Sequence, residues 1–271
     1  MSEFVHLQVK SHYSLKSGLP TPKNIVDAAC KKGLKAVALT DKNSFFGIIK
    51  FYNYAISKGI KPICGVDFDI ESNLKGLTKG LLLAKNKKGL EKLFSLSTKS
   101  YLQANKAIKI NGNEILALKD DIIFILPSDN FSEYKSTDIQ DGKDFVVTIE
   151  ALKKAFSSNL YLGVTNYSEN TYDENSSNLI KFCSERNIHA VALNDVHFIK
   201  QNDYLNHQAK VAINKATHLR SEMENPTCSK EQYFKTFDEM KSIHKEDLLL
   251  NTFKIAKQCN VFLSEEEYFL P

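Results

Sequence analysis

The stretch KAVALTDKNSFFGIIKFYNYAISKGIKPICGVDF (residues 35–68) decides the fold class. Its first six residues, 35–40, are an apolar, β-rich run that predicts a buried strand. Residues 44–59 have a helical pattern that ends at a glycine, and residues 60–68 form a second apolar run with Pro62 near its start. A buried strand, a helix and a buried strand in this order are typical of parallel pairing, because the helix must cover the sheet.

The same alternation continues along the chain in both directions. Residues 4–9 (FVHLQV) alternate in polarity and predict a strand. The helix that follows has Thr21 as its N-cap, Pro22 in its first position and Gly33 at its end. The further predicted strands are 80–84, 121–126, 159–165 and 188–194, and the further predicted helices are 87–104, 148–158, 174–187 and most of the chain from 201, with an extended finish near Tyr268.

These elements make about seven strands, most of them followed by a helix. The predicted class is therefore α/β, and a barrel and an open doubly wound sheet both satisfy the pattern. In either architecture, a site would form in the loops at the carboxyl ends of the strands. Residues 105–120 are expected to be irregular, because Asn111 and Gly112 indicate a turn.

Composition excludes several classes of protein. The chain has 271 residues, 42% of them hydrophobic, and five cysteines without a CxxC motif, so a disulfide framework or a zinc ribbon is not expected and a reducing cytoplasm fits best. No stretch approaches the roughly 18 apolar residues of a membrane span. The net charge is +4. Because lysines and glutamates are interspersed, this permits an acidic or nucleic-acid partner without requiring one.

Polar residues follow several of the predicted strands. They are Gln8, Lys10, Ser11 and His12 after the first, Asp41 and Lys42 after the second, Asp67 at the third, Lys79 around the fourth, and Asp195 and His197 after the seventh. Loops from distant segments converge on one rim in such folds, and this is how a metal or phosphate site is assembled.

Asp195 and His197 are the best candidate metal ligands by residue type, a carboxylate and an imidazole two positions apart. A zinc or manganese centre needs at least three protein ligands, and His6, His12, Asp41 and Asp67 are candidates for the rest. The alternative is that Asp195 and His197 only brace their loop, which is the commoner role of such residues. The chain contains no GxSxG, P-loop or GxGxxG motif.

Several blocks resemble a known family. FVHLQVKSHYSLKSG, AVALTDKNSFFGIIKFYNYA, GIKPICGVDF, LLLAKN, AVALNDVHF and the final EYFLP occur in the order and spacing of the bacterial DNA polymerase III alpha subunit. The resemblance implies a PHP domain, which is a distorted seven-stranded (β/α) barrel. It implies a single domain over 1–271, with a helical extension over about 201–271. That extension leads toward a polymerase body that begins near EYFLP, so we expect the natural chain to continue.

Active members of this family carry a cluster of about three metal ions that supports phosphoester hydrolysis. This chain departs from their pattern. In the motif that resembles HLHVH, Gln8 and Lys10 replace two histidines, Ser17 replaces an aspartate, and Lys42 replaces the histidine of TDH. Asp67 stands in place of a glutamate, Lys79 stands in place of a histidine, and only Asp195 and His197 clearly remain.

An ammonium group has no lone pair for a metal and brings its own positive charge. We therefore hypothesise that Lys10, Lys42 and Lys79 replace metal ions and pair with Asp41, Asp67 and Asp195. No catalytic residue and no metal are then expected. The vestigial pocket would consist of Gln8, Lys10, Ser17, Asp41, Lys42, Asp67, Lys79, Asp195 and His197.

The resemblance also implies a cellular role. The segment would be a non-enzymatic module in cytoplasmic DNA replication that docks the epsilon-type proofreading exonuclease. The rest of the polymerase III holoenzyme, DNA and the Mg²⁺ of a DNA-directed DNA polymerase would be met through the full-length chain. One alternative is an active metal-dependent phosphoesterase or 3'-5' exonuclease with a trinuclear zinc or manganese centre on His12, Asp67, Asp195 and His197, and with Asp41. Another is direct DNA contact by a basic face.

Overall fold

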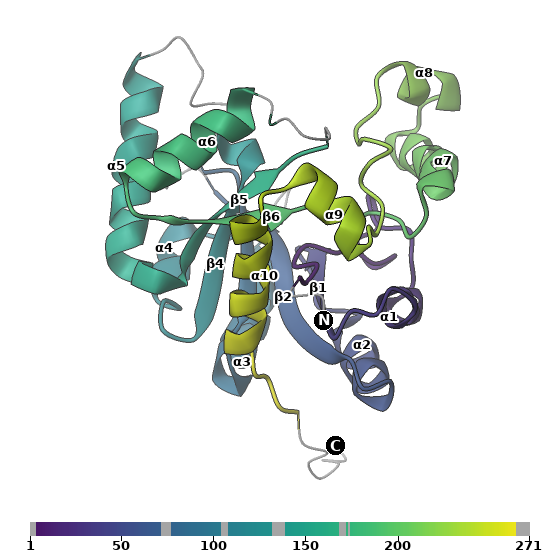
Figure 1. Cartoon of the computed structure of the whole chain (residues 1–271), viewed down its shortest axis with the longest axis horizontal. Coiled ribbons are helices and arrows are strands. Elements are labelled where there is room, and N and C mark those ends of the chain that lie inside the picture. Colours follow the sequence, from purple (N-terminus) through teal and green to yellow (C-terminus); the bar gives the residue numbers. More distant parts are fainter. Residues whose placement is uncertain are drawn as a thin grey trace.

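The computed structural model describes residues 4–71, 77–103, 108–131, 139–167, 172 and 174–263. Six strands form one sheet that curls into an open half-barrel (Figure 1). The strand order follows the sequence from β1 to β6. The strands are β1 (Ala36–Lys42), β2 (Lys61–Asp69), β3 (Lys79–Ala84), β4 (Ile122–Pro127), β5 (Leu160–Thr165) and β6 (His189–Leu193).

The expectation of a wholly parallel sheet is wrong for its middle. β1 pairs with β2 in parallel, as do β4 with β5 and β5 with β6, but β3 runs antiparallel to both of its neighbours. The connection between β2 and β3, residues 70–78, is too short for the helical crossover that a parallel pair needs. This reversal puts the amino end of β3 at the edge where β2 ends, since Asp69 pairs with Lys79.

The predicted first strand, residues 4–9, is not a strand of the sheet, so the described residues give six strands rather than seven. The segment lies between β1 and the loop after β6. Ala38 N donates to His6 O at 3.0 Å, and Val196 N donates to Gln8 O at 2.9 Å. Its hydrogen bonds also go to side chains, as Val9 N donates to Thr40 Oγ1. Because some of these bonds go to side chains, no continuous ladder forms, yet the segment spans the gap between the first and last strands.

Helices cover the sheet, but not all of them lie where the sequence predicts. Those of the first two thirds are α1 (Pro22–Lys31), α2 (Ile48–Ser57), α3 (Lys87–Gln103), the short α4 (Gly112–Leu116), α5 (Ile139–Phe156) and α6 (Glu174–Glu185). α4 falls within residues 105–120, which were expected to be irregular, and α5 begins nine residues before the predicted helix 148–158. The N-cap prediction for α1 is confirmed, because Thr21 accepts from Asn24 N and Pro22 opens the helix. α2 begins four residues later than predicted, because a turn follows β1 in which Asn43 takes a positive φ of 54°.

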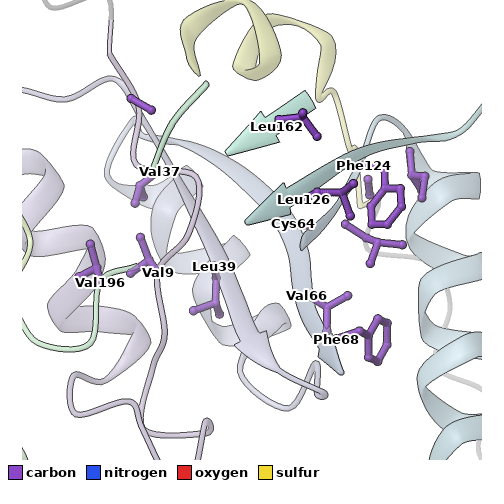
Figure 2. Packing of buried hydrophobic residues seen from close by; sticks show 14 of the residues in the cluster. Val9, Val37, Leu39, Cys64, Val66, Phe68, Phe124, Leu126, Leu162 and Val196 are labelled. Atoms are coloured by element: carbon purple, nitrogen blue, oxygen red, sulfur yellow. The ribbon is translucent and has the colours of Figure 1, made fainter. Parts of the chain in front are cut away.

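Both faces of the sheet are buried. Along β1, Val37 and Leu39 point into the larger apolar cluster, while Ala36 and Ala38 belong to a second cluster on the opposite face. Figure 2 shows part of the larger cluster, with Val9 beside Val196 next to β1. The continuous apolar runs of the strands follow from this double burial.

The last third of the chain contains helices joined by irregular connections. α7 (Tyr204–Lys215) and α8 (Leu219–Glu224) project to one side, and α9 (Phe237–Ile243) leads to α10 (Glu246–Gln258), which lies across the sheet (Figure 1). α10 contributes Ile255 and Ala256 to the second core cluster, so it is part of the packed body. The predicted finish near Tyr268 lies outside the described residues. In the described part of the chain, no helix has the length and apolarity that crossing a membrane requires.

Candidate functional site

Most of the predicted rim residues meet at the edge of the sheet where β1 and β2 end. The segment 4–10 brings Gln8 and Lys10 there, β1 brings Asp41 and Lys42, and β2 brings Asp67. The loop after β6 brings Asp195 and His197 to the same place. The sequence therefore predicted correctly that these distant segments converge.

Lys10 occupies the centre of this cluster. Its Nζ forms ion pairs with Asp195 and, at 3.2 Å, with Asp67 Oδ2. Gln8 Nε2 also donates to Asp67 Oδ2, at 3.1 Å. Lys10 is only 4% exposed and Asp67 only 3%. Burial alone would lower the pKa of Lys10, but the carboxylates of Asp195 and Asp67 outweigh it and raise that pKa above its ordinary value.

Asp195 is held in place by its backbone and by three side chains. Its φ of 42° lies in the left-handed region, which aspartate tolerates better than most residues. Its carboxylate meets Lys10, His197 Nε2 at 3.0 Å and Gln232 Nε2 at 3.3 Å. Burial opposes its ionisation, but the charge of Lys10 and then that of His197 hold its pKa well below the ordinary value.

His197 is placed between two hydrogen-bond acceptors. Its Nε2 faces the Asp195 carboxylate, and its Nδ1 lies 2.8 Å from the carbonyl oxygen of Ser17. A ring nitrogen that contacts an acceptor must carry a proton to donate. A metal ion binds instead to the lone pair of an unprotonated ring nitrogen. A metal ion at His197 would therefore break either the contact of Nε2 with Asp195 or that of Nδ1 with Ser17.

Asp41 forms a separate centre, and none of the ion pairs among the described residues includes it. It is 1% exposed, and its carboxylate accepts from Ser11 N at 2.7 Å, from Ser11 Oγ at 2.7 Å and from Ser14 Oγ at 2.6 Å. Burial raises the pKa of Asp41, although the hydrogen bonds from Ser14 and Ser11 act in the opposite direction. Nothing in the sequence pattern predicted that Ser11 and Ser14 donate hydrogen bonds to Asp41, apart from the short spacing between the two serines.

The predicted pairing of Lys42 differs from the structure. Lys42 Nζ pairs with Asp69, at 3.0 Å from Oδ1, in a contact whose side chains are 37% and 27% exposed. Side chains alternate along a strand, so Lys42 points away from its neighbour Asp41. The backbone of Lys79 is braced at the same edge by Asn130, whose Oδ1 accepts from Lys79 N at 3.1 Å. Lys10 therefore forms the predicted ion pairs with Asp67 and Asp195, while Lys42 pairs with Asp69.

His12 and Ser17 are close to the cluster but outside its ion pairs. In the part of the chain that the structure describes, His12 Nδ1 and Ser17 Oγ are buried without a hydrogen-bond partner. The carbonyl oxygen of Ser17, in contrast, accepts from both His197 and His207.

Behind His197 lies a neutral pair that the sequence gave no reason to expect. His207 Nε2 donates to the Ser17 carbonyl oxygen at 2.7 Å, and its Nδ1 lies 3.2 Å from Cys228 Sγ. Burial and then the charge of His197 lower the pKa of His207 to about 4, and burial raises that of Cys228 to about 12. Both side chains are therefore uncharged near neutral pH, and together they buttress the ring of His197.

This arrangement does not fit a metal ion between Asp67 and Asp195. The ammonium of Lys10 already lies between these two carboxylates, and two like-charged cations cannot share the space. Among the residues that the structure describes, no group of three or more His, Cys, Asp or Glu side chains could hold a metal. The contacts that the cluster shows are those of buried charges that compensate one another.

The half-barrel with a polar rim is the architecture of a known class of domain. The PHP domain family matches residues 6–167, which is more than half of the chain. The chain therefore belongs to the PHP domain family.

The chain is also homologous over its whole length to one replication protein. DNA polymerase III subunit alpha of Buchnera aphidicola subsp. Schizaphis graminum is 32% identical over 283 residues, a match that covers 100% of this chain and 24% of the relative. The same subunit of Escherichia coli K12 is 31% identical, with 100% and 24% covered, and that of Pseudomonas aeruginosa is 31% identical, with 99% and 23% covered. The chain thus spans about a quarter of the length of these relatives.

A comparison with solved structures finds a two-domain protein from Bacteroides vulgatus that contains a predicted PHP-like metal-dependent phosphoesterase. It is 15% identical and has a TM-score of 0.48, over 93% of this chain and 68% of that one. This likeness is too weak to carry an argument about activity.

Proposed function

We propose that this chain is the N-terminal PHP module of a replicative DNA polymerase III alpha subunit, with a metal pocket that has become an ion-pair cluster. The module would be non-catalytic. It would support the polymerase body and dock the proofreading exonuclease subunit. Its wider context would be the cytoplasmic holoenzyme and, through the full-length chain, DNA and the Mg²⁺ of polymerisation.

The observation that carries this proposal is the position of Lys10. Its Nζ lies 3.2 Å from Asp67 and is ion-paired with Asp195 as well, so one protein cation takes the place between two acidic side chains. A metal-dependent phosphoesterase clamps the attacking and leaving oxygens with divalent ions. An ammonium offers no open coordination position, so it cannot replace that function.

Metal analysis tests the non-catalytic part of the proposal. The untagged 271-residue protein is dialysed against zinc or manganese, freed of excess ion and measured by elemental analysis. We expect much less than one equivalent of either metal, and no change in melting temperature on addition of EDTA. Stoichiometric zinc or manganese that depends on Asp195 and His197 would instead support the phosphoesterase alternative.

The docking part of the proposal is tested separately. The same protein is mixed with the purified proofreading exonuclease subunit of the same organism, and complex formation is measured by calorimetry. A saturable one-to-one complex is expected. Absence of binding at micromolar concentrations would refute the docking role and leave the result of the metal analysis unaffected.

A further inference from the structure

Residues 11–18, which we call the rim loop, lie against the sheet edge that carries the ion-pair cluster. Ser11 and Ser14 donate to the buried carboxylate of Asp41. The hydroxyl oxygen of Ser14 also accepts from Lys42 N, at 2.9 Å. These bonds hold the rim loop against the end of β1.

The rim loop is wound tightly on itself. Ser17 N and Gly18 N both donate to Ser14 O at 2.9 Å, and Ser14 N donates to Ser11 O. A Cβ on Gly18 would lie 1.8 Å from Ser11 O, so this position requires a residue without a side chain. None of these bonds uses the carbonyl oxygens of Leu15, Ser17 and Gly18, which accept from outside the loop.

One face of α7 supplies a donor to each of these three carbonyl oxygens. The pairs are His207 Nε2 with Ser17 O at 2.7 Å, Lys210 Nζ with Gly18 O, and Asn214 Nδ2 with Leu15 O at 3.3 Å. The donors stand at positions 207, 210 and 214, a spacing that puts them on the same side of a helix. α7 therefore grips the rim loop by its backbone.

The attachment of α7 to the rest of the protein is polar, whereas its attachment to α8 is firm. The buried apolar side chains of α7, Val211 and Ala212, belong to neither of the two apolar clusters on the faces of the sheet. Lys215 Nζ pairs with Glu222 Oε2 of α8 at 2.7 Å, and Glu222 is only 3% exposed. We therefore expect α7 and α8, which project from the body in Figure 1, to move as one hairpin.

The carbonyl oxygen of Ser17 connects this hairpin to the ion-pair cluster. It accepts from His207 and also from His197 Nδ1, at 2.8 Å. The two imidazole rings pack edge to face, with 5.2 Å between centroids. His197 Nε2 in turn contacts Asp195, the ion-pair partner of Lys10. Movement of α7 away from the loop would thus remove a donor from Ser17 O and uncover the ring of His197.

We propose that α7 is a latch that keeps the rim loop closed over the ion-pair cluster, and that the α7–α8 hairpin and the rim loop open together. Opening admits water to Lys10 while the sheet stays folded, because α7 is outside the apolar clusters of the sheet. Hydrogen bonds to carbonyl oxygens exchange with water at small net cost, so the closed state is favoured only modestly. Units held in this way open locally without global unfolding.

Two readouts in the 271-residue protein follow the two sides of the latch. Cys228 reports on α7, because its Sγ lies 3.2 Å from His207 Nδ1 and the residue is 7% exposed. Its modification by Ellman's reagent is followed in a Cys30→Ser background, and mass spectrometry assigns the modified peptide. Amide hydrogen exchange of residues 10–18, measured by NMR, reports on the rim loop. Where closing outpaces the reaction, both rates follow the population of the open state.

The main variant and its control each remove one lysine that donates to a backbone carbonyl. Lys210→Met removes the bond from α7 to Gly18 O. Lys153→Met removes a bond of the same kind on α5, where Lys153 Nζ donates to Arg186 O at 2.6 Å. Methionine keeps most of the side-chain volume in both variants, and thermal melting shows that each is folded.

We expect Lys210→Met to accelerate both the modification of Cys228 and the exchange of the rim loop by about tenfold, and Lys153→Met to leave both within about twofold. The two rates should rise by the same factor, because one opening exposes both sites. Acceleration at only one site would show that α7 and the rim loop open independently and would overturn the proposal. Unchanged rates at both sites would also overturn it.

A reciprocal variant perturbs the latch from the loop. Gly18→Ala displaces the rim loop, since the new Cβ cannot remain beside Ser11 O. If the loop and α7 open together, Cys228 reacts faster in this variant although α7 is unaltered, and an unchanged Cys228 rate in the folded variant refutes the coupling. Should Gly18→Ala fail to fold, Asn214→Ala replaces it. Asn214 is exposed, so this variant stays folded and should accelerate both readouts, by less than Lys210→Met does.

Discussion

Lys10 Nζ lies 3.2 Å from Asp67 Oδ2, with both side chains almost completely buried. Asp195, whose side chain is 22% exposed, completes the group, so one largely buried ammonium faces two carboxylates that water screens only weakly. Such groups add little net stability, because desolvation of the charges offsets their attraction. They nevertheless make the fold depend on every member, since loss of one leaves the others uncompensated.

Lys10→Met is therefore expected to be strongly destabilising. The substitution keeps most of the side-chain volume but removes the charge that compensates Asp67 and Asp195. We expect the free energy of unfolding to fall by about 3–5 kcal/mol. Urea unfolding of the wild type and the variant at pH 7 measures this difference.

Lys42→Met serves as the control for that experiment. Lys42 also forms an ion pair, with Asp69, but in a partly exposed position. Exposed pairs contribute about 0–1 kcal/mol, so this variant should stay within about 1 kcal/mol of the wild type. Equal losses in the two variants would show that burial of the Lys10 cluster is not what matters.

Replacing Asp41 by asparagine should destabilise the protein much less than replacing it by alanine. Its carboxylate satisfies Ser11 N and the hydroxyl groups of Ser11 and Ser14. Asp41→Ala leaves these buried donors without an acceptor, at an expected cost of about 2–4 kcal/mol. Asp41→Asn retains one acceptor oxygen and should cost clearly less. The free energies of unfolding of the two variants, compared at pH 7, decide the point, and equal losses would contradict it.

The order and position of the elements were predictable because they depend on local apolar runs. The predicted strand 60–68 is β2, Lys61–Asp69, and the predicted strand 188–194 contains β6, His189–Leu193. The reversal at β3 was missed, although the short connection at residues 70–78 held the signal. The segment expected as a strand at 4–9 makes scattered backbone hydrogen bonds to residues 38–40 and 196, and Val9 N donates to the Thr40 side chain, so it forms no continuous ladder.

The site was predictable as a set of residues but not as a set of contacts. A rim position follows from where a strand ends, which correctly grouped Lys10, Asp67 and Asp195. Which oxygen each lysine meets depends on side-chain direction and on turns after the strands. Lys42 therefore reached Asp69, which was not a candidate, and Gln232 came from an irregular connection without any motif.

The thiol of Cys30 should react much faster than the thiols of the other four cysteines. Cys64, Cys183, Cys228 and Cys259 are buried, and burial raises the pKa of each to about 12. Cys30 is exposed. Because the thiolate is the reactive form, a disulfide reagent such as Ellman's should modify one thiol quickly in the native protein and five in denaturant. Cys30→Ser should abolish the fast phase, and fast reaction of two or more native thiols would contradict this assignment.

Stability should fall as the pH is lowered from 6.5 to 4, mainly because of three buried histidines. Burial lowers the pKa values of His6, His207 and His244 to about 4. In the unfolded chain, each titrates near the ordinary value of about 6.5. Between these limits the unfolded state binds more protons, so each histidine contributes a loss of up to about 1.4 kcal/mol per pH unit on acidification. Asp41 has the opposite effect on stability. Because its pKa is raised in the folded state, the folded protein takes up this proton at a higher pH than the unfolded chain does.

The contribution of one histidine can be isolated with His244→Gln. His244 is buried, and its Nε2 has no hydrogen-bond partner among the described residues, so its protonation in the folded state is not compensated. The variant should show a slope of unfolding free energy against pH that is smaller by about one third between pH 6.5 and 4. Urea titrations at four pH values measure this slope. An unchanged slope would mean that His244 gains access to water before the chain unfolds.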